Sequence, residues 1–217
     1  MNPFSIHFPE TLFSRHPLRL LLRNALRNNV VLSALTEQEL NEMENILTIA
    51  EVAKGQSLLA QGASEMEQYF ILEGVLKRVV TGPEGKQMIL RFAQETQIET
   101  SYAAWRLRNH APYCICTVTR ARIAKCPMVV WVEYLDGHPK LKYAFEYEVM
   151  RLMCEVMEHT TALHLLDATG RLDRFQDRSP GLADVLPKKD LALYLNMAPE
   201  TLSRILGSHD YSVPLVV

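Results

Sequence analysis

The spacing of apolar residues changes along this chain of 217 residues, and that change limits the folds it can adopt. Between about residues 52 and 124 the sequence divides into short β-rich pieces separated by turn signals, whereas beyond Pro139 apolar residues recur at helical intervals. Short, evenly spaced strands favour an antiparallel barrel or jelly roll. The fold class predicted is therefore α+β, with a β-roll followed by helices.

Local signals mark individual elements within this outline. The segment "TGPEG" at residues 81–85 lies between two predicted strands and is typical of a hairpin connection. Before the β-rich region, Thr36 and Glu39 have the spacing of a capping box at the start of a helix. The N-terminal 50 residues or so are therefore predicted to form a helical cap.

A long helix is predicted after the β-rich region, and it carries two apolar stripes. The first stripe is Leu141, Phe145, Val149, Leu152 and Val156. The second is Met150, Met153 and Met157. Two stripes require two partners, so we assign one to the β-roll and the other to the same helix of a second subunit, with the first stripe as the expected dimer interface. The alternative is one wide core face inside a monomer.

The C-terminal part is predicted to contain short helices. The segment "LLDATGRL" at 165–172 indicates a hinge, "DRSPGLADVLP" a loop, and "KKDLALYL" and "PETLSRIL" two helices. Asn196, between these helices, stands where a tight turn needs a left-handed backbone, and Pro199 suits the first turn of the second helix. This spacing fits a helix-turn-helix and an ordinary helical hairpin about equally well.

Three motifs in the same order resemble the cyclic-AMP receptor protein / fumarate-nitrate regulator (CRP/FNR) family of bacterial transcription factors. They are "FILEGVLKRV…EGKQMIL", the hinge segment and "LPKKDLALYLNMAPETLSRIL", and the resemblance covers about residues 35–207. It implies a cyclic-nucleotide-binding-like sensor domain with its cap at 1–137, a dimerisation helix at 138–166 and a helix-turn-helix domain at 167–217. It also implies a homodimer that binds a palindromic site in double-stranded DNA, with RNA polymerase as a candidate partner.

The resemblance also indicates which residues bind DNA. They are Lys188, Lys189, Glu200, Thr201, Ser203 and Arg204. Glu200 and Arg204 match family positions that contact base edges, where arginine recognises guanine and a carboxylate accepts from cytosine N4. Thr201 and Ser203 lie beside phosphates by the same resemblance, and the two lysines are candidates for phosphate contacts or for simple solvation.

The effector site of the family is altered in this chain. Members that bind cyclic AMP carry a Gly-Glu pair for the ribose and an Arg-Ser or Arg-Thr pair for the phosphate. The matching positions here hold Thr100, Ser101, Ala111 and Pro112. The phosphate would lose its charged partner, so we expect an effector other than cyclic AMP in this mode, or none. Arg106 and Arg108 are candidate substitutes, with solvated loop arginines as the alternative reading.

No cofactor is assigned from the sequence, and neither a metal site nor a catalytic residue is predicted. No CxxC pair occurs among the four cysteines, which are Cys114, Cys116, Cys126 and Cys154. Cysteines that are buried core thiols are commoner than cysteines that bind a metal. No cysteine precedes Cys114, so the N-terminal cluster of iron–sulfur relatives is absent. His159 and His164 leave haem ligation as a minor alternative. The alternative of a cupin-type enzyme requires a cluster of histidines and a carboxylate that bind a metal. Between residues 52 and 124 the one histidine is His110, so this cluster is missing.

Charge and chain length bound the remaining expectations. The net charge of −2 means that DNA binding has to come from local clusters. No membrane span is predicted and cysteines are few, so a cytoplasmic location is expected. Only "SHDYSVPLVV" follows Gly207, where the family continues into a β-hairpin wing, so a shortened wing is expected. The alternative function is a ligand- or partner-binding sensor module with impaired or lost DNA binding.

Overall fold

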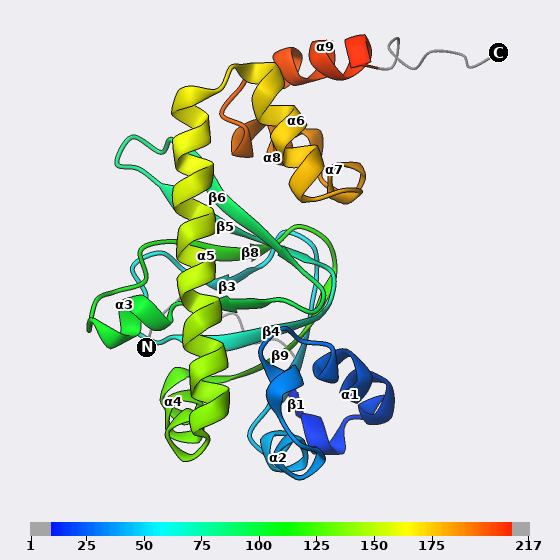
Figure 1. Ribbon diagram of the computed structural model, residues 1–217, viewed down its shortest axis with the longest axis vertical. Helices are drawn as coiled ribbons and strands as arrows, with labels where there is room; N and C mark the ends of the chain where they lie inside the picture. The colour runs from blue at the N-terminus through cyan, green and yellow to red at the C-terminus, as the bar shows by residue number, and fades with distance from the viewer. Residues whose placement is uncertain (1–9, 210–217) are drawn as a thin grey trace, which may run out of the picture.

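The computed structural model describes residues 10–209, with side chains placed up to Gly207. Figure 1 shows two β-sheets with one long helix, α5 (Pro139–Leu165), running beside them. Helices α1 (Arg19–Arg27), α2 (Glu37–Met43) and α4 (Met128–Gly137) lie towards one end of this helix, and the C-terminal helices lie at the other.

The two sheets are antiparallel, which confirms the α+β class and the predicted β-roll. One has the order β1-β2-β9-β4-β7 and the other β3-β8-β5-β6. The strands are β1 (Glu10–Leu12), β2 (Thr48–Val52), β3 (Ser57–Leu59), β4 (Glu67–Glu73), β5 (Val75–Thr81), β6 (Gln87–Gln94), β7 (Ile98–Thr100), β8 (Cys114–Thr117) and β9 (Ala121–Pro127). Strand β1 pairs with β2 at the edge of the five-stranded sheet, within the N-terminal stretch that was predicted to be helical. Three residues carry too little pattern for such a strand to be recognised.

Two turns fix the strand connections. The predicted "TGPEG" hairpin is confirmed, since Thr81 pairs with Gln87 and the Gly82 N–H donates to the Lys86 carbonyl at 2.8 Å. The turn between β4 and β5 requires Gly74, whose φ is +91°. A Cβ at this position would lie 2.4 Å from the Arg120 carbonyl oxygen, so any other residue would clash with backbone.

The cap and the first half of α5 close the roll. The capping box is confirmed: the Glu39 N–H donates to the Thr36 hydroxyl, and the Glu39 carboxylate accepts from the Thr36 N–H at 2.7 Å. Trp131 of α4 is fully buried and packs edge-on against Phe70 and Phe145, each with 5.2 Å between ring centroids. The roll, the cap and α5 thus share one hydrophobic core.

The C-terminal helices pack on the outside of the roll. They are α6 (Ala168–Arg178), α7 (Leu182–Val185), α8 (Lys188–Tyr194) and α9 (Pro199–His209). Their apolar side chains form a second cluster with Val75, Val79, Ile89 and Phe92 of the four-stranded sheet. Because side chains alternate along a strand, one sheet serves both clusters, and the helices do not build a core by themselves.

Two local expectations need correction. The hinge is shorter than predicted: α5 ends at Leu165, and the Asp167 carboxylate accepts from the Gly170 N–H at 2.8 Å, which caps α6 and places Gly170 inside that helix. The segment "DRSPGLADVLP" is not a plain loop, since it holds the end of α6 and all of α7. A one-turn helix has too few residues to show a period.

Candidate nucleic-acid interface and ligand cavities

Helices α8 and α9 have the geometry of a helix-turn-helix. Asn196 adopts φ +49°, which confirms the predicted left-handed turn residue. The Ala192 carbonyl accepts from the Met197 N–H at 3.0 Å, which holds the turn against α8. The apolar side chains between the two helices are buried: Leu191, Leu195, Leu202 and Ile205. Pro199 begins α9, where its missing N–H costs no helical bond.

The predicted DNA-binding residues lie on the solvent side of this pair of helices. Lys188, Lys189, Glu200, Ser203 and Arg204 are exposed, and Thr201 is half-buried. In Figure 1, α9 lies at the extreme end of the molecule, away from the sheets. The polar face of α9 is therefore open to a macromolecular partner, and the roles of its residues remain predictions.

Helix α8 is held against the roll by polar and aromatic contacts. The Lys77 ammonium of β5 pairs with the Asp190 carboxylate at 2.7 Å, and both side chains are mostly buried. The ring of His159 from α5 stacks on Tyr194, with centroids 3.8 Å apart and planes 3° from parallel. These residues are far apart in sequence, so their spacing gave no signal that they meet.

The first apolar stripe of α5 does not lie on a free surface. Leu141, Phe145, Val149 and Leu152 are buried inside the chain itself, and Val156 is half-buried. The four buried residues belong to the core that α5 shares with the roll and cannot offer free surface to a second subunit. Their assignment as the dimer interface was therefore wrong, because helical spacing identifies a stripe without indicating which partner covers it.

A different stripe of α5 is exposed. We call it the α5 seam: Tyr143, Tyr147, Met150, Cys154 and Met157. Its members are separated by four, three, four and three residues, which is the a/d repeat of a coiled coil. Tyr143 is 74% exposed and Met157 64% exposed, values unusual for large apolar side chains on a helix that also packs on a core. Met153 is exposed beside the seam.

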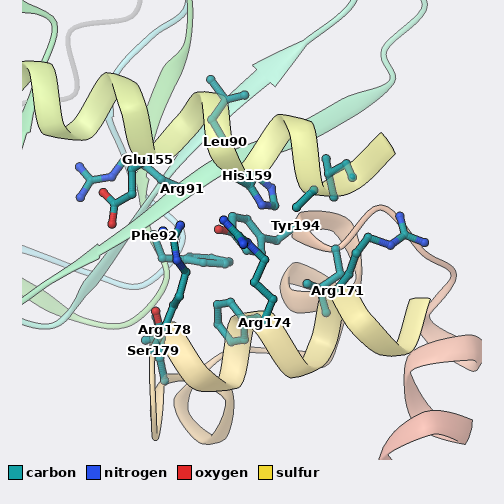
Figure 2. Close-up of a pocket in the computed structure, with 15 residues that line it drawn as sticks. Leu90, Arg91, Phe92, Glu155, His159, Arg171, Arg174, Arg178, Ser179 and Tyr194 are labelled. Atoms are coloured by element: carbon teal, nitrogen blue, oxygen red, sulfur yellow. The ribbon is translucent and has the colours of Figure 1, made fainter. Parts of the chain in front are cut away.

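The six predicted effector residues do not share one site. Three of them are buried: Thr100, which ends β7, Ser101 and Ala111. None of the three lines the open cleft or the smaller cavity of Figure 2. Pro112 is exposed. Arg106 and Arg108 lie instead in an open cleft of about 620 Å³ together with Ser64, Met66, Trp105, Asn109 and His110.

The interior of the roll beside Thr100 is occupied by an ion cluster that the sequence analysis missed. The buried Glu99 carboxylate accepts from Arg78 at 2.7 Å and from Arg91 at 2.5 Å, and the Arg78 guanidinium lies 4.2 Å from the Tyr113 ring centroid. Tyr113 in turn donates to the Thr100 carbonyl at 2.8 Å. Glutamate in "IET" and arginine in "LKRV" look like surface residues in sequence, and only the roll places them together.

A second cavity lies between the roll and the C-terminal helices (Figure 2). We call it the α5–α6 cavity; its volume is about 70 Å³. Figure 2 shows Arg174 and Arg178 of α6 pointing towards His159 of α5, Phe92 of β6 and Tyr194 of α8, whereas Arg171 points away from them. Its polar lining residues are Arg91, Glu155, His159, Arg171, Arg174, Arg178 and Ser179, and its rings are Phe92, Phe175 and Tyr194.

His159 makes folding sensitive to acid. Burial lowers the pKa of its imidazole from 6.5 to about 4, partly offset by a hydrogen bond to the Tyr194 backbone. Since the unfolded chain binds the proton more readily, stability is lost as pH falls from 6.5 towards 4. This loss should reach about 3 kcal/mol at the low end, at 1.36 kcal/mol per pKa unit. Urea unfolding between pH 7 and pH 4.5 measures it.

The matched comparison is His164, which is exposed on the same helix. The His159→Gln variant should show a shallower dependence of unfolding free energy on pH, whereas His164→Gln should keep the wild-type slope. Equal slopes in both variants would contradict the assignment to His159.

Two thiols lie together on β8. Cys114 and Cys116 have their Sγ atoms 3.0 Å apart, and the Ser57 hydroxyl lies 3.3 Å from Cys114. The hydrogen bond from Cys116 lowers the pKa of Cys114 to about 6 against the effect of burial, and the pKa of Cys116 is raised. The pair therefore loses its first proton more easily than an isolated thiol. Residues two apart on a strand point to the same face, which is why these two thiols meet.

Other ligand chemistries find little support in the described part of the chain. Residues 10–209 contain no group of three or more His, Cys, Asp or Glu side chains that could hold a metal ion. His159 is buried against Tyr194 while His164 is exposed, so the two haem candidates do not face one site. Among the described helices, none is long and apolar enough to cross a membrane. Residues 210–217, where the shortened wing was expected, lie outside the described residues.

Comparisons with known proteins find regulatory proteins that resemble this chain. No family model matches the chain. The chain is 25% identical over 191 residues to the nitrogen fixation regulation protein FixK of Bradyrhizobium diazoefficiens, covering 83% of this chain and 79% of FixK. The c-di-GMP responsive global regulator CLP of Xanthomonas campestris aligns with a TM-score of 0.66 at 12% identity, over 81% of this chain and 92% of CLP. A transcriptional regulator of the CRP/FNR family from Eubacterium rectale aligns with a TM-score of 0.67 at 11% identity, over 85% and 88%. These structures share the fold.

Proposed function

Because the chain shares its fold with a CRP/FNR-family regulator and is similar in sequence to FixK, we propose that it is a DNA-binding transcription regulator of the CRP/FNR type, a homodimer that recognises a two-fold symmetric DNA site. The observation that carries this proposal is the α8–turn–α9 geometry, with Asn196 left-handed and a polar face of α9 open to solvent. A recognition helix in this arrangement enters the major groove with its N-terminal residues at base edges.

Glu200 and Arg204 are the proposed base readers. They lie four residues apart on α9 and therefore on one face of the helix. An arginine donates two hydrogen bonds to guanine, and a carboxylate accepts from cytosine N4. Lys188 and Lys189 at the start of α8 supply the positive charge that orients the helices on phosphates.

The α5 seam is the proposed dimer interface. In a parallel coiled coil its tyrosines and methionines would fill the a and d positions. The same register places Glu146 and Arg151 five residues apart at g and e positions, which are the positions that pair between helices. A dimer of this kind presents two copies of α9 and explains why a palindromic site is expected.

Replacing Arg204 by alanine tests base reading. Arg204→Ala should weaken binding to the preferred duplex by about 1–3 kcal/mol and relax the preference at one base pair in each half-site. Lys189→Ala is the contrast, because losing a phosphate contact should weaken all sequences alike and lower the salt slope by about one. Titrations of wild type and variants on matched and mutated duplexes measure both effects.

Selection of DNA sites from random duplexes can contradict the proposal. If selection from random duplexes at moderate salt enriches no palindrome with protein that is folded and dimeric, the chain is a sensor or interaction module without DNA reading. If Arg204→Ala weakens binding to every duplex equally, as Lys189→Ala is expected to do, then Arg204 contributes only electrostatic binding and does not read a base.

We propose further that the effector is not cyclic AMP bound in the mode of the family, or that no effector binds. Ala111 and Pro112 offer no charge to a cyclic phosphate, and the nearby arginines Arg78 and Arg91 are already bound to Glu99. A calorimetric titration with cyclic AMP should show no saturable binding at micromolar concentration. Saturable binding there would show that other residues replace the missing contacts.

A further inference from the structure

The α5–α6 cavity has more positive than negative charge around it. Four arginines and one glutamate line it: Arg91, Arg171, Arg174, Arg178 and Glu155. The carboxylates just outside are shared, since Glu158 binds both Arg174 and Arg178, and Glu99 binds both Arg91 and Arg78. Arg171 donates to the Asn196 carbonyl and points away from the cavity (Figure 2). The excess positive charge at the cavity therefore comes from Arg174 and Arg178, which share the single carboxylate of Glu158.

One buried nitrogen at this cavity lacks a partner. His159 is 9% exposed, so its side chain is removed from solvent. Within the described residues, His159 Nε2 has no hydrogen-bond partner. A buried polar nitrogen without a partner is costly, and its position beside the cavity indicates that the cavity receives a polar group.

The rest of the wall is apolar. Phe92, Phe175 and Tyr194 meet here, with the Phe92 and Tyr194 ring centroids 5.2 Å apart and those of Phe175 and Tyr194 5.5 Å apart. A volume of about 70 Å³ accommodates roughly five water molecules. An occupant of this size has an oxyanion group and only a few carbon atoms.

From these features we propose that the α5–α6 cavity is a binding site for a small organic oxyanion, with its carboxylate or phosphate group at Arg174, Arg178 and His159. Its short apolar body lies among the three rings. Guanidinium groups suit both kinds of oxyanion, because their planar donors match the oxygen pair of either.

The occupant would join parts of the chain that are otherwise held by few polar contacts. Its arginine partners are on α6, whereas His159 is on α5 and Phe92 is on β6. Binding therefore strengthens the attachment of the C-terminal helices to the rest of the chain, in addition to the Lys77–Asp190 pair and the pairs of Glu158 with Arg174 and Arg178. Any effect of this ligand on DNA recognition depends on the proposed function being correct. The existence of the binding site does not depend on it.

The test uses the full-length protein without DNA, so that its outcome is separate from that of DNA binding. Butyrate and ethyl phosphate are the probes, and neutral butyramide is the matched control, all at constant ionic strength with sodium chloride. Either oxyanion should raise the melting temperature in a saturable way, and the comparison of the two shows which head group the site prefers. Amide hydrogen exchange of α6 and α8 should slow at saturation, while exchange in α1 should not change.

Variants locate the binding. Arg178→Gln should raise the dissociation constant of the oxyanion about tenfold or more, because a charge-assisted hydrogen bond is lost. Arg120→Gln is the control, since this exposed arginine pairs with Glu51 on the roll. The proposal is overturned if neither oxyanion stabilises the protein, if butyramide does so equally, or if both variants bind as the wild type does.

Discussion

Replacing Glu99 by glutamine is expected to lower the free energy of unfolding by about 3–5 kcal/mol, because it leaves two buried guanidinium groups without a counter-charge. Glu99 is 0% exposed, and Arg78 and Arg91 are 8% and 5% exposed. The change is nearly isosteric, so the loss reports charge and not volume. Urea or thermal unfolding of the purified variant measures it.

Glu51→Gln is a close control for this prediction. Glu51 also binds two arginines, Arg120 and Arg122, but on the surface of the roll, and hydrogen bonds from both lower the pKa of its carboxyl. Because solvent screens these charges, the variant should lose no more than about 1 kcal/mol. Similar losses in the two variants would mean that the interior cluster is not specially dependent on Glu99.

Replacing Met150 by aspartate should convert the dimer to monomers. In the proposed coiled coil two aspartates would face each other in an apolar seam, at a cost of at least about 3 kcal/mol, or more than a hundredfold in the dissociation constant. Met150 is 58% exposed in the single chain, so the fold itself should persist. Sedimentation equilibrium measures the mass, and affinity for a two-fold DNA site should fall with it.

Cys154 gives a direct check on the register. At an a position of a parallel dimer it faces its own copy, so mild oxidation should produce a covalent dimer on a non-reducing gel. Cys154→Ser should remove this product, and Met153→Cys in that background should restore it only weakly because Met153 lies beside the seam. A wild-type protein that is monomeric at micromolar concentration would falsify the interface.

Local order was predictable because it depends on neighbouring residues. The capping box at Thr36 and Glu39, the hairpin at 81–85 and the left-handed Asn196 each rest on a few adjacent residues whose backbone preferences are strong. The long helix after Pro139 was equally clear from its period. The succession of roll, long helix and paired helices therefore follows from sequence alone.

Contacts between residues that are distant in the sequence were not predictable. Spacing placed two stripes on α5, but whether a stripe meets the roll or solvent depends on how the helix lies against the sheets. The first stripe, expected at the dimer interface, has four of its five residues buried within the chain. The Glu99 cluster and the α5–α6 cavity join residues from strands and helices that are distant in the chain. The sequence by itself determined which elements form and in what order, since these depend on local backbone preference and periodicity. Only the tertiary structure decided which charges are buried, which apolar face remains open and where a ligand can enter, because those depend on long-range packing.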